Sequence, residues 1–126
     1  MSSKSRRRYS CGVELALTLI SGKWKPVILA HLKQGPMRYG ELRRRIPGLS
    51  DKMLAQRLRE LEEFGLISRR KSGGRGARSV YALTARAQAL RPALAALNAW
   101  GTKMSAEVGA TIVAPLAPPM RITPSS

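Results

Sequence analysis

The sequence contains very few of the side chains from which catalytic and metal sites are built. Among its 126 residues there is one cysteine, Cys11, one histidine, His31, and only seven acidic residues. A single cysteine excludes an internal disulfide and a multi-cysteine metal cluster, and a structural zinc ion would lack its ligands. No nucleophile, base and orienting group can be assembled from so small a set, so we expect no enzyme, no metal and no cofactor.

Long apolar runs are absent as well. No stretch of about 18 apolar residues, the length that a transmembrane helix needs, occurs in the chain. The basic segment 4–8 is followed by amphipathic sequence rather than by the apolar core of a signal peptide. We therefore expect a soluble, cytoplasmic, nucleoid-associated protein with no membrane partner.

Length and composition suit one compact domain, because 44% of the residues are hydrophobic and can form a core. We expect a flexible basic leader over residues 1–10, the folded domain over residues 11–108, and a flexible tail over residues 109–126. The tail is predicted from its four prolines and its lack of any apolar periodicity.

Positive charge is what the sequence has in excess. Lysine and arginine number 23 against 7 aspartates and glutamates, which gives a formal net charge of +16. Almost all of the excess precedes residue 87, because residues 87–126 contain only Arg91, Lys103 and Arg121 against Glu107. Such a balance predicts a polyanionic partner. The clustering of the cations at turns and helix starts favours nucleic acid over an acidic membrane surface.

The apolar pattern predicts three helices in the first part of the domain. Apolar residues recur at helical spacing over residues 13–20 and 26–32, and Leu42 and Ile46 share one face of a short basic helix over residues 38–46. Glycine and proline separate these helices, at Gly22, Gly35-Pro36 and Pro47-Gly48.

A fourth, longer helix follows and has two distinct faces. Ser50 is placed to cap it, Gly65 to end it, and a leucine stripe at four- and three-residue spacing forms its buried side. The stripe consists of Leu54, Leu58 and Leu61. At about 100° per residue, the opposite face carries Lys52, Gln56, Arg59 and Glu63, with Met53 and Glu60 on one flank.

The order of charge along this helix, cations first and acids last, opposes the helix dipole by roughly 0.3 to 1 kcal/mol per charge. Stability alone would not select that order. A helix that inserts its amino-terminal half into a major groove explains it, since the cations then meet phosphates while Glu60, Glu62 and Glu63 stay outside. The alternative is an ordinary solvated face of mixed charge.

Two short strands, over residues 66–71 and 78–83, are predicted around the glycine-rich segment 72–77. Such a hairpin can run along a sugar-phosphate backbone or place an arginine in a minor groove. The alternative is a charged edge that only prevents aggregation. The cations of this hairpin are Arg69, Arg70, Lys71, Arg75 and Arg78.

The last predicted helix begins after Thr84 and carries an apolar stripe, with Pro92 either near its start or kinking it. The stripe comprises Leu90, Leu94, Leu97, Met104 and Val108. The core of so small a domain is already supplied by the other helices, so we expect a second copy of the chain to cover this stripe. Packing inside one chain is the alternative.

The resulting fold class is mainly α with a small β-hairpin, a winged helix-turn-helix with a dimerisation helix at its carboxyl-terminal end. The predicted contacts to double-stranded operator DNA are Arg38, Arg43, Arg44, Ser50, Lys52, Met53, Gln56, Arg57, Arg59, Arg70, Arg75 and Arg78.

Seven short strings, in order, closely resemble the HxlR family of bacterial transcription regulators. They are Cys11-Gly-Val-Glu14, Gly22-Lys-Trp-Lys25, Tyr39-Gly-Glu-Leu-Arg43, Ile46-Pro-Gly-Leu-Ser50, Leu58-Arg-Glu-Leu-Glu62, Val80-Tyr-Ala-Leu-Thr84 and Trp100-Gly101. Each string alone is weakly specific, whereas the set is specific, and the resemblance covers residues 11–104. The chain differs from the family in having Gly12 where proline is common and a basic wing turn over residues 72–77.

The resemblance implies a homodimer, joined through its first and last helices, that binds an inverted-repeat operator. We assign the dimer contacts to Leu15, Leu19, Leu90, Leu94, Leu97, Trp100 and Met104. Several regulators of this type sense oxidants or electrophiles with a cysteine at the position of Cys11, which makes Cys11 a candidate redox sensor. The alternative for Cys11 is a small buried residue packed against the first helix.

Two alternatives to a sequence-specific regulator remain from other classes. A basic RNA-binding or nucleoid structural protein would bind random and operator DNA equally. A small enzyme lacks the side chains described above. Trp24 and His31 are interpreted as packed residues of the core.

Overall fold

The protein is described from a computed structural model, which covers residues 7–72 and 78–116. It is mostly helical, with one three-stranded antiparallel sheet in the order β1-β3-β2. No helix in the described ranges is long and apolar enough to cross a membrane. The elements are α1 (Gly12–Ile20), α2 (Lys25–Leu32), β1 (Met37–Arg38), α3 (Tyr39–Arg45), α4 (Asp51–Glu63), β2 (Ile67–Ser72), β3 (Arg78–Leu83), α5 (Ala85–Gln88) and α6 (Arg91–Glu107).

The start and end of α4 follow the sequence signals. The Ser50 hydroxyl accepts a hydrogen bond from the Met53 amide at 3.1 Å, so Ser50 caps the helix as expected. Gly65 has φ of +75°, a left-handed conformation that glycine adopts without strain, and it ends the helix. Local sequence signals therefore determine where α4 begins and where it ends.

The sheet contains a strand that the sequence did not predict. Met37 and Arg38 form β1 and pair with Tyr81 and Val80 of β3, whereas Arg38 was expected to begin a helix. Pro36 precedes this segment, Met37 is buried, and Arg38 has the extended backbone of a helix cap. Through β1, the sheet joins the start of α3 to the hairpin. Within the hairpin, β2 and β3 pair as a regular antiparallel ladder in which Ile67 lies opposite Leu83.

The carboxyl-terminal helix expected after Thr84 is two helices. Thr84 caps the short α5 by accepting a hydrogen bond from the Ala87 amide at 3.3 Å, and the chain turns before α6 begins at Arg91. Pro92 lies in the first turn of α6, where its missing N–H costs no helical hydrogen bond. Of the two roles considered for Pro92, the structure shows the helix start and not the kink.

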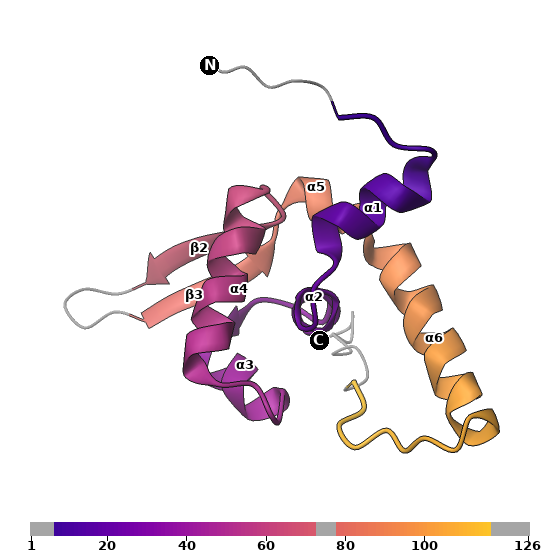
Figure 1. Ribbon diagram of the computed structural model, residues 1–126. Helices are drawn as coiled ribbons and strands as arrows, with labels where there is room; N and C mark the ends of the chain where they lie inside the picture. The colour runs from indigo at the N-terminus through magenta and orange to yellow at the C-terminus, as the bar shows by residue number, and fades with distance from the viewer. Residues whose placement is uncertain (1–6, 73–77, 117–126) are drawn as a thin grey trace, which may run out of the picture.

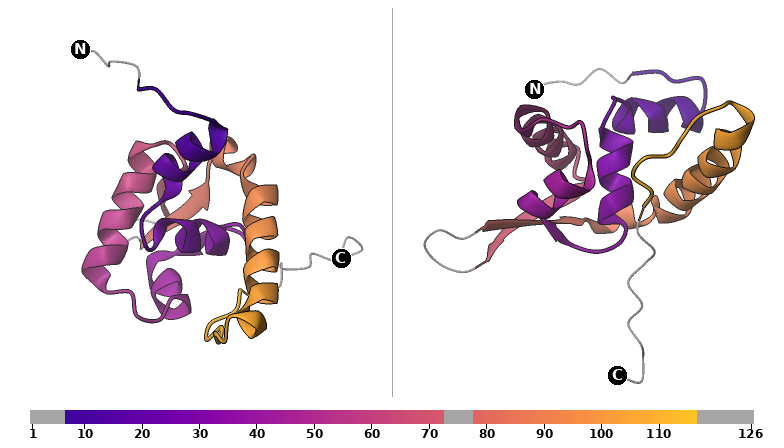
Figure 2. Two further views of the ribbon diagram at one scale, coloured as in Figure 1. Left: turned by 45° about the vertical axis from the view of Figure 1, so that its right-hand side comes forward. Right: turned by 90° about the horizontal axis from the view of Figure 1, so that it is seen from below.

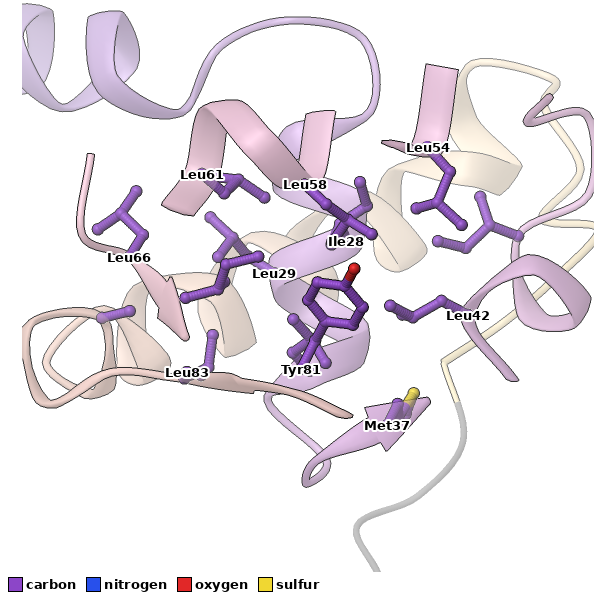
Figure 3. Packing of buried hydrophobic residues seen from close by; sticks show 14 of the residues in the cluster. Ile28, Leu29, Met37, Leu42, Leu54, Leu58, Leu61, Leu66, Tyr81 and Leu83 are labelled. Atoms are coloured by element: carbon purple, nitrogen blue, oxygen red, sulfur yellow. The ribbon is translucent and has the colours of Figure 1, made fainter. Parts of the chain in front are cut away.

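The core lies between α2, α4 and the sheet. Figure 3 shows the leucines of α4 beside Ile28 and Leu29 of α2, with Tyr81 and Leu83 of β3 below them. Leu94 of α6 belongs to this core and is only 3% exposed. Leu94 was expected at the dimer interface. That prediction is wrong, because the side chain of Leu94 is buried in the core of its own chain. Trp24 packs against the same core, as predicted.

The segment after α6 has no regular secondary structure. Figure 1 shows residues 109–116 running back from the end of α6 toward α2. Ala114 and Leu116 are half-buried there. The remainder of the predicted tail, residues 117–126, lies outside the described residues, as do residues 1–6 of the predicted leader.

Candidate nucleic-acid interface

The chain presents two contrasting sides. In Figure 1 and in the view from below in Figure 2, α3, α4 and the hairpin lie at one side, while α1 and α6 lie at the other. Five cations among the predicted DNA contacts are exposed on the first side: Arg38, Arg44, Lys52, Arg59 and Arg70. These cations are placed where an extended polyanion could meet all of them.

The predicted reading face of α4 is present. Lys52 and Arg59 are exposed, and the half-buried Gln56 lies between them on the same face. The side-chain amide of Gln56 donates a hydrogen bond to Glu60 at 3.3 Å, which limits its rotation. Ser50 is occupied as the helix cap and Met53 packs partly against the core, so these two predicted contacts lie at the edge of the face.

The first turn of α4 is held on α3 by two side chains. Arg43 donates from Nε to Asp51 Oδ1 at 2.7 Å and from Nη1 to the Leu49 carbonyl. The Tyr39 hydroxyl donates to the Asp51 carbonyl at 3.0 Å and lies 3.2 Å from Oδ1. We call Tyr39, Arg43 and Asp51 the α3–α4 clamp. Arg43, expected to contact DNA, therefore also fixes the turn between the two helices.

The charges inside the clamp reinforce one another. The hydrogen bond and the charge of Arg43 hold the pKa of Asp51 below its usual value, and the Tyr39 hydrogen bond contributes further. Partial burial and the neighbouring Asp51 carboxylate raise the pKa of Tyr39. At neutral pH the clamp is therefore an arginine, a carboxylate and a neutral hydroxyl, each in the state that the hydrogen bonds require.

A second cluster joins α4 to α2. Arg57 Nη1 donates to Glu60 Oε1 at 2.8 Å, and Lys25 Nζ lies 3.5 Å from the same oxygen and 5.0 Å from the Phe64 ring centre. Burial opposes ionisation of Glu60, but hydrogen bonds from Arg57 and Gln56 and the nearby cations outweigh it and lower its pKa. Arg57, predicted to contact DNA, is thus engaged within the chain.

These pairs give two of the acids on α4 a role within the chain. Glu60 pairs with Lys25 and Arg57, and Glu62 lies 3.9 Å from Arg69 of β2. Glu60 and Glu62 therefore tie the second half of α4 to α2 and to the sheet. Interactions within the chain account for the positions of these two acids, whereas the exposed Lys52 and Arg59 have the position expected of DNA contacts.

A hollow of about 460 Å³ lies beside α4 and the sheet. Arg59 and Arg69 line it together with Tyr39 and Tyr81. Glu62 and Glu63 also line the hollow, so its charges are mixed. The hairpin tip with Arg75 lies outside the described residues, and so does the side chain of Arg78.

The opposite side of the molecule carries several exposed apolar side chains. Leu15 of α1 and Leu97 and Trp100 of α6 are exposed, with Trp100 at 63%. Val13 and Leu17 extend the exposed apolar surface of α1. Of the other predicted dimer contacts, Leu19 and Leu90 are half-buried against the core and Met104 is half-buried on α6.

Cys11 occupies the N-cap position of α1 and is exposed, so it is not the small buried residue considered as the alternative. The neighbouring backbone amides of Glu14 and Val13 lower the pKa of its thiol, and the Ser10 side chain contributes. This is the helix-terminus effect expected from the sequence. Arg7 and Arg8 are exposed nearby in the chain, and Arg6 lies outside the described residues.

Three residues of the site were not predicted to take part in it: Tyr39, Asp51 and Lys25. Asp51 and Lys25 do stand beside predicted features, the Ser50 cap and the Gly22-Lys-Trp-Lys25 string. Their partners lie 8 and 35 positions away in the sequence, at Arg43 and Glu60, so local periodicity gave no signal for these pairs.

The arrangement defines a winged helix-turn-helix: α3 and α4 form the helix pair, α4 is the reading helix, and β2 and β3 form the wing. The fold class predicted from the sequence is confirmed. Residues 19–108 match the family described as HxlR-like helix-turn-helix.

Known proteins agree with that match. An HTH-type transcriptional regulator of Methanothermobacter thermautotrophicus is 44% identical over 93 residues, covering 74% of this chain and 71% of the relative. The structure of the redox regulator HypR in its reduced form has a TM-score of 0.74 at 31% identity, covering 79% of this chain and 98% of that one. Reduced YodB from Bacillus subtilis has a TM-score of 0.64 at 32% identity, covering 75% and 94%.

The chain belongs to the HxlR-like helix-turn-helix family. It is a DNA-binding transcriptional regulator.

Proposed function

We propose that the protein binds an inverted-repeat operator as a homodimer. The observation that carries the proposal is the division of the surface: exposed cations over α3, α4 and β2, and exposed apolar side chains of α1 and α6 on the other side. Two copies joined through α1 and α6 would place their reading helices about 34 to 36 Å apart, one turn of B-DNA. Such a protein would work in the cytoplasm, on the nucleoid.

Within each half-site, α4 is the reader and its neighbours are anchors. Lys52 or Arg59 can reach guanine acceptors and Gln56 can pair with adenine, whereas Arg38, Arg44 and Arg70 are placed for phosphates. Arg75 and Arg78 of the wing are proposed as further backbone contacts. Arg43 acts through the α3–α4 clamp as well as through its charge.

The test is a footprint of the DNA upstream of the protein's own gene, with affinities for the protected site and for a scrambled duplex measured at the same salt concentration. A discrete protected site with two half-sites, and affinity at least about 10³-fold above the scrambled duplex, is expected of a regulator. Equal affinity and no discrete site would show instead the non-specific nucleic-acid-binding protein considered from the sequence.

We further propose that oxidants regulate this binding through Cys11. The thiol is exposed at a helix amino terminus with a lowered pKa, so a larger fraction is thiolate at neutral pH than for an ordinary surface thiol. The reduced HypR structure, of a protein described as a redox regulator, has the same fold. Oxidation of Cys11 beside the α1 surface would change the contact between two copies.

The test is operator affinity before and after diamide, with a reductant added back. Wild-type protein is expected to change its affinity and to recover, while Cys11→Ser keeps one affinity throughout. An identical response of wild type and variant assigns Cys11 a structural role. This outcome leaves the proposal of operator binding intact, because untreated protein tests that separately.

A further inference from the structure

Glu60, on the flank of the reading face of α4, is held at both of its carboxylate oxygens. Arg57 Nη1 donates to Oε1 at 2.8 Å, and Lys25 Nζ of α2 lies 3.5 Å from the same oxygen. The other oxygen, Oε2, accepts a hydrogen bond from the side-chain amide of Gln56 at 3.3 Å. The two cations therefore meet one oxygen of Glu60, and Gln56, the proposed reader of adenine, meets the other.

The surroundings of Glu60 restrain it and keep it charged. The side chain of Lys25 is only 11% exposed and that of Arg57 only 20%, so the cations that hold Oε1 are themselves packed within the chain. Burial opposes ionisation of Glu60, but hydrogen bonds from Arg57 and Gln56 and the charges of the two cations lower its pKa. Glu60 is therefore a carboxylate at neutral pH and offers Gln56 only acceptors.

This carboxylate determines the orientation of the Gln56 amide. An amide has an oxygen that accepts and a nitrogen that donates through two N–H groups, so the nitrogen of Gln56 must face Glu60. One of the two N–H groups is used in that bond. No hydrogen bond joins the other N–H or the carbonyl oxygen to the residues that the structure describes, which leaves one donor and one acceptor for a base.

One donor beside one acceptor matches adenine and not guanine. In the major groove adenine presents the N7 acceptor and the N6 donor, whereas guanine presents two acceptors, N7 and O6. An unrestrained glutamine can turn both of its N–H groups toward guanine. Gln56 cannot, because Glu60 occupies one of them, and the carbonyl oxygen of Gln56 would then face O6 of guanine with no proton between them.

We propose that Glu60 is a positioning residue that restricts Gln56 to adenine, a role that rests on the proposed binding of an operator through α4. Glu60 acts by holding the amide of Gln56 in one of its two orientations and needs no contact with a base. This role is separate from the ion pairs of Glu60, because the cations use Oε1 whereas the orientation of Gln56 depends on Oε2.

Competition between duplexes that differ at one base pair tests this role. The pair that Gln56 reads is the one at which Gln56→Ala loses discrimination. There the wild-type protein should prefer A·T over G·C by about 5- to 150-fold. Glu60→Ala should reduce the preference to within about 3-fold, chiefly by binding the G·C duplex more tightly, because the released amide can use both N–H groups.

Glu60→Gln is the more specific test, because it keeps the shape of the side chain. Arg57 and Lys25 only donate at Oε1, so the new amide keeps its oxygen there and places its nitrogen at the position of Oε2. Gln56 then turns its carbonyl oxygen toward that nitrogen and leaves both N–H groups for the base. The preference should move from adenine to guanine, which a purely stabilising role of Glu60 would not produce.

Glu62→Ala is the matched control, since it removes another carboxylate of α4 that pairs within the chain, here with Arg69. It should keep the wild-type preference for A·T. Urea denaturation shows which variants are folded at the temperature of the binding measurements. Should Glu60→Ala unfold because its two cations lose their partner, Glu60→Gln, which still accepts from both, decides the question.

The outcomes that overturn this role differ from those that overturn operator binding. A wild-type preference for A·T in the folded Glu60 variants refutes the role of Glu60 and leaves operator binding intact. If no discrete site is protected, operator binding is refuted and the role of Glu60 with it. If Gln56→Ala loses discrimination at no base pair of a protected site, base reading by Gln56 and its positioning by Glu60 are both refuted.

Discussion

Asp51, the first residue of α4, accepts a hydrogen bond from Arg43 of α3 at 2.7 Å. The bond crosses the turn of the helix pair, directly before Lys52, so the turn that presents the reading face is braced at its start. Tyr39 adds its hydroxyl to the same residue. The position of the first turn of α4 therefore depends on side chains of α3.

Tyr39→Phe tests this clamp, because it deletes one hydroxyl and keeps the packed ring. The free energy of unfolding should fall by about 0.5 to 1.5 kcal/mol, the net value of one hydrogen bond. Operator affinity should fall as well, since the first turn of α4 is held less firmly. Urea denaturation and fluorescence anisotropy measure the two effects. Tyr81→Phe is the control, because no hydrogen bond joins its hydroxyl to the described residues, and an equal loss there would argue against the clamp.

Arg44→Ala and Arg43→Ala should distinguish the binding of a DNA phosphate from the stabilisation of the turn between α3 and α4. Each neutralised phosphate contributes about 0.9 to the slope of log affinity against log salt, so Arg44→Ala should flatten the slope by about that amount on specific and random DNA alike. Its stability should stay unchanged because Arg44 is exposed. Arg43→Ala should lower both stability and affinity. A loss confined to operator DNA for Arg44→Ala would contradict its role as a phosphate contact.

Gln56→Ala should relax sequence specificity without greatly weakening binding to random DNA. A bidentate amide–adenine pair is worth about 1 to 3 kcal/mol of discrimination, which is roughly 5- to 150-fold in relative affinity. Competition between operator and scrambled duplexes measures it. Should the ratio stay at the wild-type value, base reading would have to be assigned to Lys52 and Arg59.

Trp100→Glu should break the proposed dimer. The ring is 63% exposed in one chain, and a carboxylate there would need to be buried without a partner between two copies. Light scattering at micromolar concentration should show a monomer, and operator affinity should drop because half-sites are then bound singly. Ala95→Glu places the same charge on another face of α6 and should remain dimeric. A monomeric wild type with tight operator binding would refute the model.

The neutral state of His31 predicts how stability changes with pH. Its pKa is lowered in the folded protein, so the unfolded chain takes up a proton that the folded chain resists as the pH falls below about 6.5. Stability should therefore be full above that pH and decrease as the pH falls from about 7 toward 5. Thermal unfolding at several pH values measures this. The difference between wild type and His31→Leu isolates the contribution of His31 from those of other groups, and identical profiles would refute it.

The sequence predicted those elements of the fold that have strong local signals. Ser50, Gly65 and the leucine stripe of α4 placed the reading helix, because caps and periodicity act within a few residues. A two-residue strand has no periodicity, so β1 was missed. The break before α6 lacks glycine, and the position of Pro92 alone suited either a start or a kink.

The candidate site was predictable only as a set of cations. Sequence position cannot show that Arg57 turns to Glu60 or that Arg43 bonds to Asp51, since those partners are fixed by how α2, α3 and α4 pack. Leu94 and Leu97 illustrate the same limit on α6. Both belong to one apolar stripe, yet one is buried in its own chain and the other is 55% exposed.

The few carboxylates of this protein are largely used in internal ion pairs, so little negative charge is left to offset the other cations. Asp51, Glu60 and Glu62 are each engaged by a nearby cation, and the chain has only seven acids against 23 lysines and arginines. The cations that remain repel one another in the free protein, and dissolved anions or DNA supply the counter-charge that the fold lacks. Added salt should therefore act with opposite sign on two properties of one molecule, as it stabilises the free fold by screening and releases the bound duplex.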